Sequence, residues 1–438
     1  MLKRTWGALL LLVAALVMAQ LTGRKLMYTV AYVVAGLLVV SLLLTAFNLL
    51  GIQVQRRTHA RRSQVGKTAD ETFTVINTLP LPKLWLEVED HSTLPFHRAS
   101  RVISSLGPHR RRIWTVRTYC VRRGRFTLGP LTLRSSDPFG FFALKRRLPD
   151  FSHIVVYPAT VDIPRFRLPF GELAGGEVMR RRTHDVTDNV SGVRDYVYGD
   201  NFSRIHWRTT ARTGRLMSKE FELDPSTDVW VYLDMDAGVH VAPPWAKVEE
   251  RSGPALLWAE RARLELLPTT EEYTVTVGAS LVRHLLTQGR SVGLVAYGQT
   301  REVAQADRGD RQLSKVLETL AVLEAKGSLP FEQILAAEGE SLPHGTTIIA
   351  VTPSAEIKWI RAARELRRRG VRIVAVLINA RSFAPAPEQN AALHELSMSQ
   401  IPTFVINRGD NIGAALSAPA AGPALDSRVR GVGQLGAA

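Results

Sequence analysis

The stretch from Val193 to Glu222 holds the side chains best equipped for chemistry, and it reads VRDYVYGDNFSRIHWRTTARTGRLMSKEFE. Arginine binds carboxylates and phosphates through paired hydrogen bonds, so this mixture of arginines and acids allows two interpretations. In the first, which we favour, Arg–carboxylate pairs lock the segment against a neighbouring domain and Trp207 packs into the core. In the second, the arginines face a groove that binds a phosphate or an acidic peptide. The candidate partner-binding residues are Arg194, Asp200, Arg204, Trp207, Arg212 and Arg215.

His206 is the residue in this stretch that most resembles a catalytic side chain. The sequence offers it no recognisable nucleophile or metal partner, so we expect it to be structural. The chain also lacks a nucleophile–base pair, a phosphate-cradling glycine loop and a metal-ligand motif. We therefore predict no enzymatic activity and no catalytic residue. A pocket that brings His206 together with Asp234 and Asp236 would revive the enzyme hypothesis.

A second candidate site follows the apolar run DVWVYL at Asp228–Leu233, where the chain continues as Asp234-Met235-Asp236-Ala237-Gly238. In open α/β sheets, function usually lies just beyond the carboxyl ends of the strands. Asp234 and Asp236 would place two carboxylates at that position.

The C-terminal half alternates short apolar runs with amphipathic stretches. The expected strands are 228–233, 291–297, 346–351, 371–378 and 403–406, and the expected helices are 273–288, 311–325, 355–369 and 387–398. Apolar strands of this kind suit a parallel sheet buried on both faces. The pattern predicts a doubly wound α/β domain over residues 227–410.

Residues 68–160 have a different pattern, with short strands separated by Pro and Gly clusters. Expected strands include 72–75, 85–88, 113–116 and 125–128. Such spacing predicts a small β-sandwich or barrel. Its basic runs, at 109–112 and 145–147, are interpreted as solvated charges on edge strands, with anionic lipid headgroups or an acidic partner as the alternative. Nucleic acid is not expected, because no reading motif accompanies the charge.

Two apolar runs open the chain, from Thr5 to Thr22 and from Leu26 to Ile52, separated by Gly23-Arg24-Lys25. A helix needs about 20 apolar residues to cross the hydrocarbon of a bilayer. We expect a two-helix transmembrane anchor over residues 5–52, hence a multi-pass cell-membrane protein. A cleaved signal peptide is the alternative for the first run.

Flanking charge predicts the orientation of this anchor. Basic residues precede the first run and follow the second, whereas only Arg24 and Lys25 lie between the two runs. The outer cations are Lys3, Arg4, Arg56, Arg57, Arg61, Arg62 and Lys67. The positive-inside rule then places both termini, and the aqueous domains, in the cytoplasm.

Charge is unevenly distributed along the chain. The formal charge is +16 overall, and residues 1–185 carry 28 Lys and Arg against 11 Asp and Glu. This bias favours contact with an anionic membrane surface or an acidic partner near it. The single cysteine, Cys120, cannot form an intramolecular disulfide, which favours a reducing compartment.

The remaining segments connect or end these units. Residues 161–190 are expected to form a linker, and residues 191–226 a distinctive segment ahead of the α/β domain. Residues 417–438 are rich in Ala, Gly and Pro, which predicts a disordered tail.

Three stretches resemble the bacterial domain of unknown function fifty-eight family. They are RRGRFTLGP with SDPFGFF (122–130 and 136–142), YGDNFSRIHWRTTARTGRLMSKEFE, which is similar to the family's GD…R.I.W..SAR.G.L..KE signature, and the strand that ends at Asp234. With the two apolar runs, the resemblance covers most of residues 1–410. It implies a membrane-linked, β-rich protein with a von Willebrand factor A-like C-terminal domain. Related proteins are often encoded near MoxR-type AAA+ ATPases and transglutaminase-like proteins.

The resemblance also raises the question of Mg²⁺. A-type domains often hold this ion through Asp-x-Ser-x-Ser, a distant Thr and a distant Asp, a set of hard oxygen ligands. Asp234 matches the first ligand, but Asp236 and Gly238 occupy the two serine positions. Ser328 and Thr352 are partial substitutes for the distant ligands. We expect a degenerate site that contacts protein, with a metal at Asp234 and Asp236 as the alternative.

Together these observations predict a membrane-tethered, non-enzymatic protein-interaction or assembly module, with a MoxR-type AAA+ ATPase as its expected partner. The alternative is a divalent-metal-dependent adhesion or ligand-binding domain that uses Asp234 and Asp236. No cofactor is expected under the first hypothesis.

Overall fold

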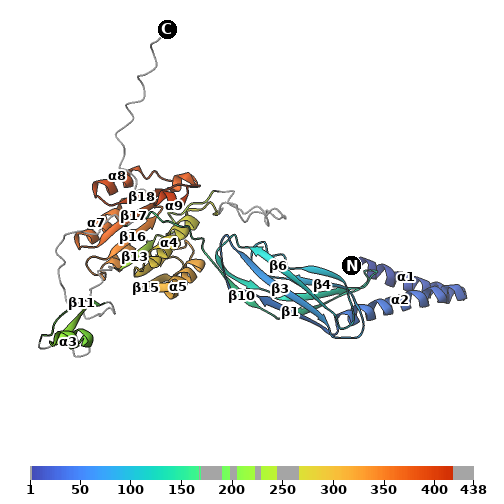
Figure 1. The fold of residues 1–438 in the computed structure, drawn as a ribbon. Helices are drawn as coiled ribbons and strands as arrows, with labels where there is room; N and C mark the ends of the chain where they lie inside the picture. The colour runs from blue at the N-terminus through green and yellow to red at the C-terminus, as the bar shows by residue number, and fades with distance from the viewer. Residues whose placement is uncertain are drawn as a thin grey trace, which may run out of the picture.

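The computed structural model describes residues 2–166, 168, 190–197, 205–221, 228–243 and 266–417. Along the chain it consists of two apolar helices, an elongated β-rich region, a small hairpin–helix unit and an α/β domain (Figure 1). This confirms, at that level, the expected order of two apolar helices, a β-rich part and an α/β part.

The N-terminal pair consists of α1 (Leu2–Thr22) and α2 (Lys25–Leu49), joined by a turn in which Gly23 has φ +62°. Both helices are long and apolar enough to cross a membrane, with mean hydropathies of 1.9 and 2.5 over their candidate spans. The second helix ends at Leu49, whereas the apolar run was expected to continue to Ile52. Ile52 instead begins a strand, because its side chain is buried in the core of the β-rich region.

The β-rich region contains ten strands in three sheets. The strands are β1 (Ile52–Thr58), β2 (Arg62–Gln64), β3 (Thr68–Asn77), β4 (Lys83–Asp90), β5 (Arg101–Leu106), β6 (Arg111–Tyr119), β7 (Gly124–Leu128), β8 (Leu131–Ser136), β9 (Ala143–Leu148) and β10 (Ser152–Tyr157). The sheet orders are β1-β3-β6, β5-β4-β8-β9 and β2-β10-β7. The region therefore begins at Ile52 rather than at residue 68, since β1 pairs with β3 along its whole length.

Alternation along β3 builds the interior of this region. Ala69, Glu71, Phe73 and Val75 are buried, while the residues between them are partly exposed. Phe73 and Val75 join one apolar cluster with Trp114, and Ala69 joins a second cluster with Cys120. Glu71 thus lies on the inward face between the two clusters.

The α/β domain is built on a six-stranded sheet with the order β15-β14-β13-β16-β17-β18. The strands are β13 (Val229–Leu233), β14 (Val292–Tyr297), β15 (Arg301–Asp307), β16 (Thr347–Thr352), β17 (Arg372–Ile378) and β18 (Thr403–Ile406). Five strands are parallel and match the five predicted runs, whereas the edge strand β15 pairs antiparallel with β14. β15 is not predicted from the sequence, because polar residues such as Glu302 and Gln305 interrupt its apolar ones and leave no continuous apolar run.

Helices cover both faces of this sheet. They are α4 (Thr270–Thr287), α5 (Gly309–Val322), α6 (Phe331–Gly339), α7 (Lys358–Arg368), α8 (Asn390–Met398) and α9 (Ile412–Ala415), with the short 3-10 helix η3 (Ala380–Ser382) after β17. One apolar cluster joins the sheet to α4, α5 and α9, and another joins it to α6, α7 and α8. Along β13, Val231 belongs to the first cluster and Tyr232 to the second, so the strand is buried on both faces.

The segment expected to be a linker, 161–190, starts as part of the α/β core. Ile163 and Phe166 are each 1 % exposed and pack in the same cluster as α4 and β18. The rest of that segment up to residue 189, apart from residue 168, lies outside the described residues, as does the expected disordered tail from residue 418.

A hairpin–helix unit precedes the α/β domain. It consists of β11 (Val190–Asp195), α3 (Trp207–Thr213) and β12 (Met217–Phe221), with β11 and β12 antiparallel. In the ribbon this unit stands apart from the sheet and its helices (Figure 1). Gly214 ends α3 in the left-handed conformation, with φ +69°.

Candidate functional site

The carboxylates predicted at the end of β13 meet the end of β16. The Thr352 hydroxyl donates a 2.5 Å hydrogen bond to Asp234 Oδ2, and the Asp236 backbone N–H lies 3.2 Å from Asp234 Oδ1. β13 and β16 are adjacent parallel strands. After β14 and β15 on one side of β13, the chain crosses to β16 on the other side. This is the point of an open α/β sheet where the connections reverse direction and ligands usually bind.

Asp234 is fully buried. Burial raises the pKa of its carboxyl group to about 7, even though Thr352 and the Asp236 N–H donate hydrogen bonds to it. His240 lies against the same residue, with Nε2 2.8 Å from the Asp234 carbonyl oxygen. Burial lowers the pKa of His240, so the imidazole is held neutral beside the buried carboxyl. The arrangement joins the ends of β13 and β16 through hydrogen bonds to the buried Asp234 carboxyl group.

A neighbouring loop closes over this position. Gly327 N–H donates to Met235 O at 2.9 Å, and Ala237 N–H donates to Gly327 O at 2.9 Å. A side chain at Gly327 would meet Tyr297 O at 2.3 Å, so only glycine fits there. The Lys326–Pro330 segment, where a ligating threonine was considered, is thereby held through its backbone. Ser328 itself is exposed.

These residues do not fit a resident Mg²⁺ ion. Both side-chain oxygens of Asp234 accept internal hydrogen bonds, and Asp236 Oδ1 accepts one from Gly238 N–H at 2.9 Å. Hard divalent ions need several free oxygen ligands that converge on one open position. Within the described ranges, no group of three or more His, Cys, Asp or Glu side chains is placed to hold a metal. Asp234 and Asp236 therefore act as elements of the loop structure.

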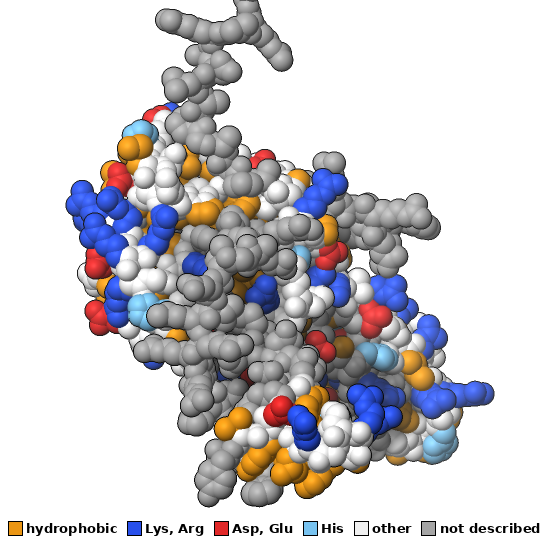
Figure 2. Space-filling view, turned by 60° about the vertical axis from the view of Figure 1, so that its left-hand side comes forward, with side chains coloured by type: hydrophobic (Ala, Val, Ile, Leu, Met, Phe, Trp, Pro, Cys, Tyr) orange, Lys and Arg blue, Asp and Glu red, His pale blue; other side chains and the backbone are white. Residues whose placement is uncertain are grey.

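The hairpin–helix unit presents a different kind of surface. Trp207 is 65 % exposed, Val197 60 % and Leu216 45 %. Arg208, Arg212 and Arg215 are exposed around them. Figure 2 shows hydrophobic and basic side chains next to one another at the bottom of the molecule, where this unit lies in Figure 1. Exposed apolar groups gathered in this way mark interaction surfaces.

The sequence candidates in this unit have different outcomes. Trp207, Arg212 and Arg215 lie together on α3 and the turn after it, and the expectation that Trp207 packs into the core is wrong. Within the described ranges, the structure gives Arg212 and Arg215 no ion pair with an acidic side chain. Arg194 is in β11 opposite Ser218, but its side chain lies outside what the structure describes. Asp200 and Arg204 lie outside the described residues altogether.

His206 has a structural role in the same unit. It is the N-cap residue of α3, and its Nδ1 accepts a hydrogen bond from Thr209 N–H at 3.2 Å. An N-cap acceptor satisfies one of the backbone donors that begin every helix. His206 lies on a different element from Asp234 and Asp236, and the described residues do not bring the three together.

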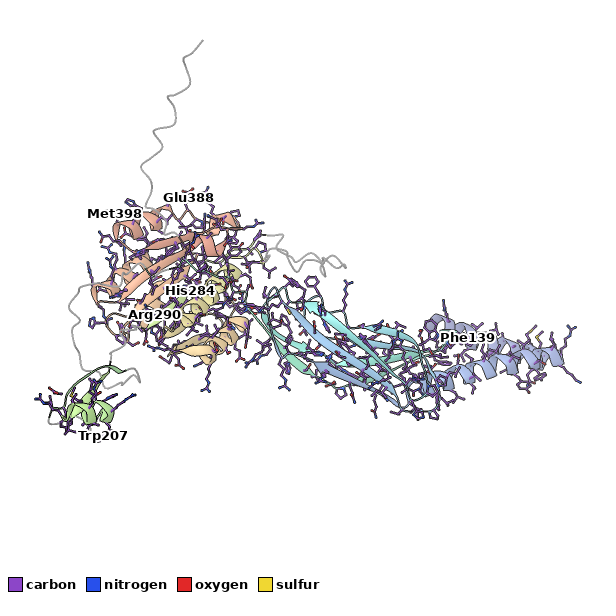
Figure 3. All side chains as sticks on the ribbon, in the orientation of Figure 1. Phe139, Trp207, His284, Arg290, Glu388 and Met398 are labelled. Carbon is purple, nitrogen blue, oxygen red and sulfur yellow. The ribbon has the colours of Figure 1, made fainter. Side chains whose placement is uncertain are left out.

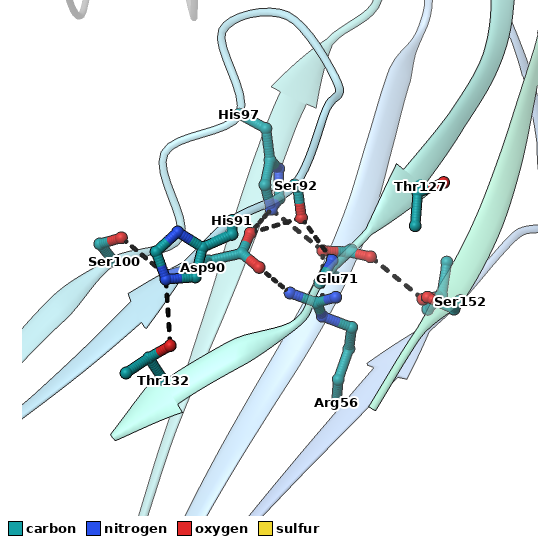
Figure 4. Close-up of polar contacts among 12 residues, drawn as sticks. Arg56, Glu71, Asp90, His91, Ser92, His97, Ser100, Thr127, Thr132 and Ser152 are labelled. Carbon is teal, nitrogen blue, oxygen red and sulfur yellow. Dashed lines mark hydrogen bonds and ion pairs between the residues drawn. The ribbon is translucent and has the colours of Figure 1, made fainter. Parts of the chain in front are cut away.

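A buried ionic network that was not predicted from the sequence lies in the β-rich region (Figure 4). His97 Nε2 lies 3.0 Å from Asp90 Oδ2 and 3.2 Å from Glu71 Oε2, and Arg56 contacts both acids. All four side chains are at most 2 % exposed. The network fills the interior between the two apolar clusters. The parity of Glu71 with Phe73 and Val75 was a signal of it in the sequence.

A second buried cation joins the β-rich region to the α/β domain. Arg123, 5 % exposed, lies before β7 and donates to Glu271 Oε1 at 2.7 Å and to Leu323 O at 2.7 Å. It also pairs with Glu272. Because Glu271 and Glu272 open α4, this contact fixes the two parts to one another at the first turn of that helix.

Comparison with known proteins gives a limited set of relatives. Residues 192–242 match the family described as "Protein of unknown function DUF58". The chain is 21 % identical over 384 residues to the uncharacterized protein YeaD of Bacillus subtilis (strain 168). The aligned region covers 84 % of this chain and 86 % of that protein.

Similarity to solved structures is weaker. The conserved hypothetical protein BatB from Bacteroides thetaiotaomicron is 13 % identical, covers 44 % of this chain and 95 % of its own, and has a TM-score of 0.30. The CARDB domain of PF1109 from Pyrococcus furiosus is 15 % identical, covers 24 % of this chain and 86 % of its own, and has a TM-score of 0.19.

Proposed function

We propose that this chain is a membrane-tethered, non-enzymatic protein-interaction module whose hairpin–helix unit binds a partner protein. The observation that carries the proposal is the exposure of Trp207, at 65 %, beside two other exposed apolar side chains and three exposed arginines. Tryptophan and arginine dominate the binding energy of protein interfaces, and an isolated helix gains nothing from exposing them. The family match, residues 192–242, covers all but the first two residues of this unit.

The chemistry of the surface indicates its partner. A partner that fits it presents carboxylates to Arg208, Arg212 and Arg215 around an apolar pocket for Trp207. The sequence resemblance suggests that this partner is a MoxR-type AAA+ ATPase, and that the α/β domain is von Willebrand factor A-like. The doubly covered parallel sheet with Asp234 at the end of β13 supports the second suggestion.

Placement of the domains in the cytoplasm belongs to the same proposal. The excess of basic residues in the membrane-proximal half supports it. An ATPase partner also requires it, because ATP is supplied on that side of the membrane. A cysteine introduced at residue 70 and probed with a membrane-impermeant maleimide in intact cells is expected to remain unlabelled.

A metal-dependent adhesion role receives less support than partner binding. The Asp234 carboxyl is fully buried and its oxygens already have donors, which leaves no open ligand position for an acidic group of a partner.

Site-specific crosslinking tests the proposal. A photo-crosslinking amino acid would replace Trp207 in one variant and Met398, which is 70 % exposed on α8, in a matched control (Figure 3). Irradiation of native membranes is expected to give an adduct with an AAA+ ATPase at position 207 and none at 398. No adduct at 207, or equal adducts at both positions, would contradict the proposal.

A further inference from the structure

A residue with a strained backbone, close to α2, interrupts the alternation of buried and exposed side chains along β4. Trp85 has φ +55°, a left-handed conformation that is rare for a bulky side chain. Leu86 and Lys83 are both buried, whereas Leu84 and Trp85 between them are 44 % and 52 % exposed. Regular alternation would bury Leu84 with Leu86. Strain of this kind persists where the surrounding structure enforces it, and it is common at functional sites.

The surrounding structure here is the last turn of α2. Lys83 Nζ donates to Phe47 O at 2.5 Å, and Leu84 N–H donates to Asn48 Oδ1 at 3.3 Å. A cation at the carboxyl end of a helix is favourable because the last carbonyl groups of the helix lack partners. The backbone conformation at Trp85 thus allows Lys83 to bind the carboxyl end of α2 while the side chains of Leu84 and Trp85 remain exposed.

The loop between β8 and β9 brings a second apolar group to the anchor. Asp137 Oδ2 accepts a 2.8 Å hydrogen bond from the Ser41 hydroxyl of α2, and Phe141 O accepts one of 2.5 Å from the Thr5 hydroxyl of α1. Phe139 stacks on Phe141 with ring centroids 5.9 Å apart, yet remains 50 % exposed. Figure 3 shows Phe139 where the helices meet the β-rich region.

Helix geometry places both groups at the edge of a bilayer. At 1.5 Å per residue, Ser41 is about 24 Å and Asn48 about 35 Å along α2 from Lys25. The hydrocarbon of a bilayer is about 30 Å thick. Phe139 therefore lies just inside, and Trp85 just outside, the hydrocarbon boundary that is remote from the Arg24–Lys25 turn.

Exposed cations lie on the neighbouring elements. Arg4, in the first turn of α1, has Nη1 3.2 Å from where a side chain at Gly140 would start. Arg111 at the start of β6 is exposed, as is Lys145 on β9, whose Nζ lies 4.0 Å from Glu89 Oε2. Aromatic side chains with flanking cations are the arrangement that proteins use at the headgroup region, especially toward anionic lipid.

We propose that Trp85, Phe139 and Leu84 form an interfacial lipid-binding collar, which seats the β-rich region on the bilayer that holds α1 and α2. The aromatic side chains lie among the upper acyl chains and glycerol groups, and the nearby cations contact lipid phosphates. The inference rests on the membrane tethering in the proposed function, and it adds that the β-rich region itself touches lipid.

Fluorescent labelling tests the collar in the full chain. With Cys120→Ala as background, which removes the only cysteine, NBD would be attached to Trp85→Cys, Phe139→Cys and Phe151→Cys in separate proteins. Phe151 is the matched control, since it is 53 % exposed and lies between β9 and β10, away from the anchor. The proteins would be placed in vesicles of phosphatidylethanolamine and phosphatidylglycerol, with doxyl-lipid and aqueous iodide as the two quenchers.

We expect doxyl lipid to quench the probes at 85 and 139 several times more strongly than the probe at 151, and iodide to show the opposite order. Equal iodide quenching at all three positions in carbonate-resistant vesicles would overturn the collar while leaving the tether intact. Loss of the protein from vesicles in carbonate would instead refute the tether. Shielding from both quenchers, with crosslinking between copies, would assign the surface to self-association and overturn the lipid assignment.

Discussion

The Ser41 hydroxyl donates its hydrogen bond to Asp137 across 2.8 Å, joining the second apolar helix to a loop of the β-rich region. Ser41 is fully buried and Asp137 is 4 % exposed. The Asp137 carboxyl group also accepts hydrogen bonds from Phe142 N–H at 2.6 Å and from Phe139 N–H at 3.0 Å. Through these contacts the helix pair and the β-rich region form one structural unit.

Removal of this hydroxyl should loosen that unit. Ser41→Ala leaves a buried carboxylate short of one donor, which is expected to cost about 1–3 kcal/mol. The measurement is the thermal unfolding of the full chain in nanodiscs. Thr29→Ala is the control, because the exposed Thr29 hydroxyl donates a hydrogen bond to Lys25 O of its own helix. Equal melting temperatures for the two variants would contradict a role for the Ser41–Asp137 bond.

The buried network in Figure 4 should make stability depend on pH. Burial opposes the charge on His97, but hydrogen bonds and charge from Asp90 and Glu71 outweigh it and raise the pKa of His97 above 6.5. Its contribution to stability is full below the unfolded pKa and is lost as the pH rises through the folded pKa. We expect the melting temperature of the wild type to fall as the pH is raised above 6.5, with a smaller fall in His97→Gln.

The same network predicts how much His97→Gln lowers the free energy of unfolding. Removal of one partner from a buried ionic cluster costs about 3–5 kcal/mol. His59→Gln is the matched control, since His59 is exposed and its Nδ1 lies near a backbone carbonyl, Asp70 O. Denaturant unfolding at pH 6 should show a large loss for His97→Gln and almost none for His59→Gln. Similar losses in both would show that the network contributes little.

Substitution of the buried Asp234 is expected to stabilise the protein, in contrast to substitution of His97. A folded pKa of about 7 against 3.8 unfolded means that its contribution is full below pH 3.8 and declines as the pH rises toward 7. Three pH units correspond to about 4 kcal/mol. Loss of the hydrogen bond that Asp234 accepts from the Thr352 hydroxyl would offset about 1–2 kcal/mol of this gain in stability. Asp234→Asn should therefore unfold at a higher denaturant concentration than wild type at pH 8, and destabilisation at that pH would refute the account of this site.

Metal should not change the stability of the protein. An ion that binds the folded state at 100 times its Kd would add about 2.7 kcal/mol to the free energy of unfolding. We expect millimolar Mg²⁺ or Mn²⁺ to give no saturable heat in calorimetry and no shift in melting temperature, in wild type as in Asp234→Ala. Saturable binding that Asp234→Ala abolishes would favour the metal-dependent alternative.

Arg123 should couple the β-rich region to the α/β domain. Arg123→Ala leaves Glu271 and Glu272 unpaired at a buried junction, so we expect the single calorimetric transition of the wild type to divide into two. Arg122→Ala is the control, because Arg122 is the exposed neighbour. A single, unshifted transition in Arg123→Ala would argue against coupling through this contact.

The sequence predicted the fold where apolar runs are continuous. The two helices and the five parallel strands carry such runs, and each is present near its predicted position. β15 and the β1–β2 segment were missed because alternating polar residues hide a strand whose partners are remote in the sequence. Arg56 was counted among the flanking cations that predict the orientation of the helix pair, whereas its side chain is 2 % exposed in the buried network.

The candidate sites were less predictable. Asp234 directly follows an apolar run, and this correctly predicted that it lies at the carboxyl end of a strand. Whether its oxygens are free depends on Thr352, which lies 118 positions farther along the chain. The exposure of the Trp207 side chain depends on which other elements pack against α3, and the sequence around Trp207 does not predict that packing. The positive φ of Trp85 likewise follows from packing on α2 rather than from residue type.

Partner binding through the hairpin–helix unit is tested most directly with purified components. The full chain in nanodiscs would be titrated with the MoxR-type AAA+ ATPase of the same genome, as wild type, as Trp207→Ser and as the control Met398→Ser. A hot-spot tryptophan contributes 2 kcal/mol or more, so Trp207→Ser should raise the Kd about 30-fold while Met398→Ser leaves it unchanged. Tight binding that is indifferent to Trp207, or no binding by the wild type, would contradict the account.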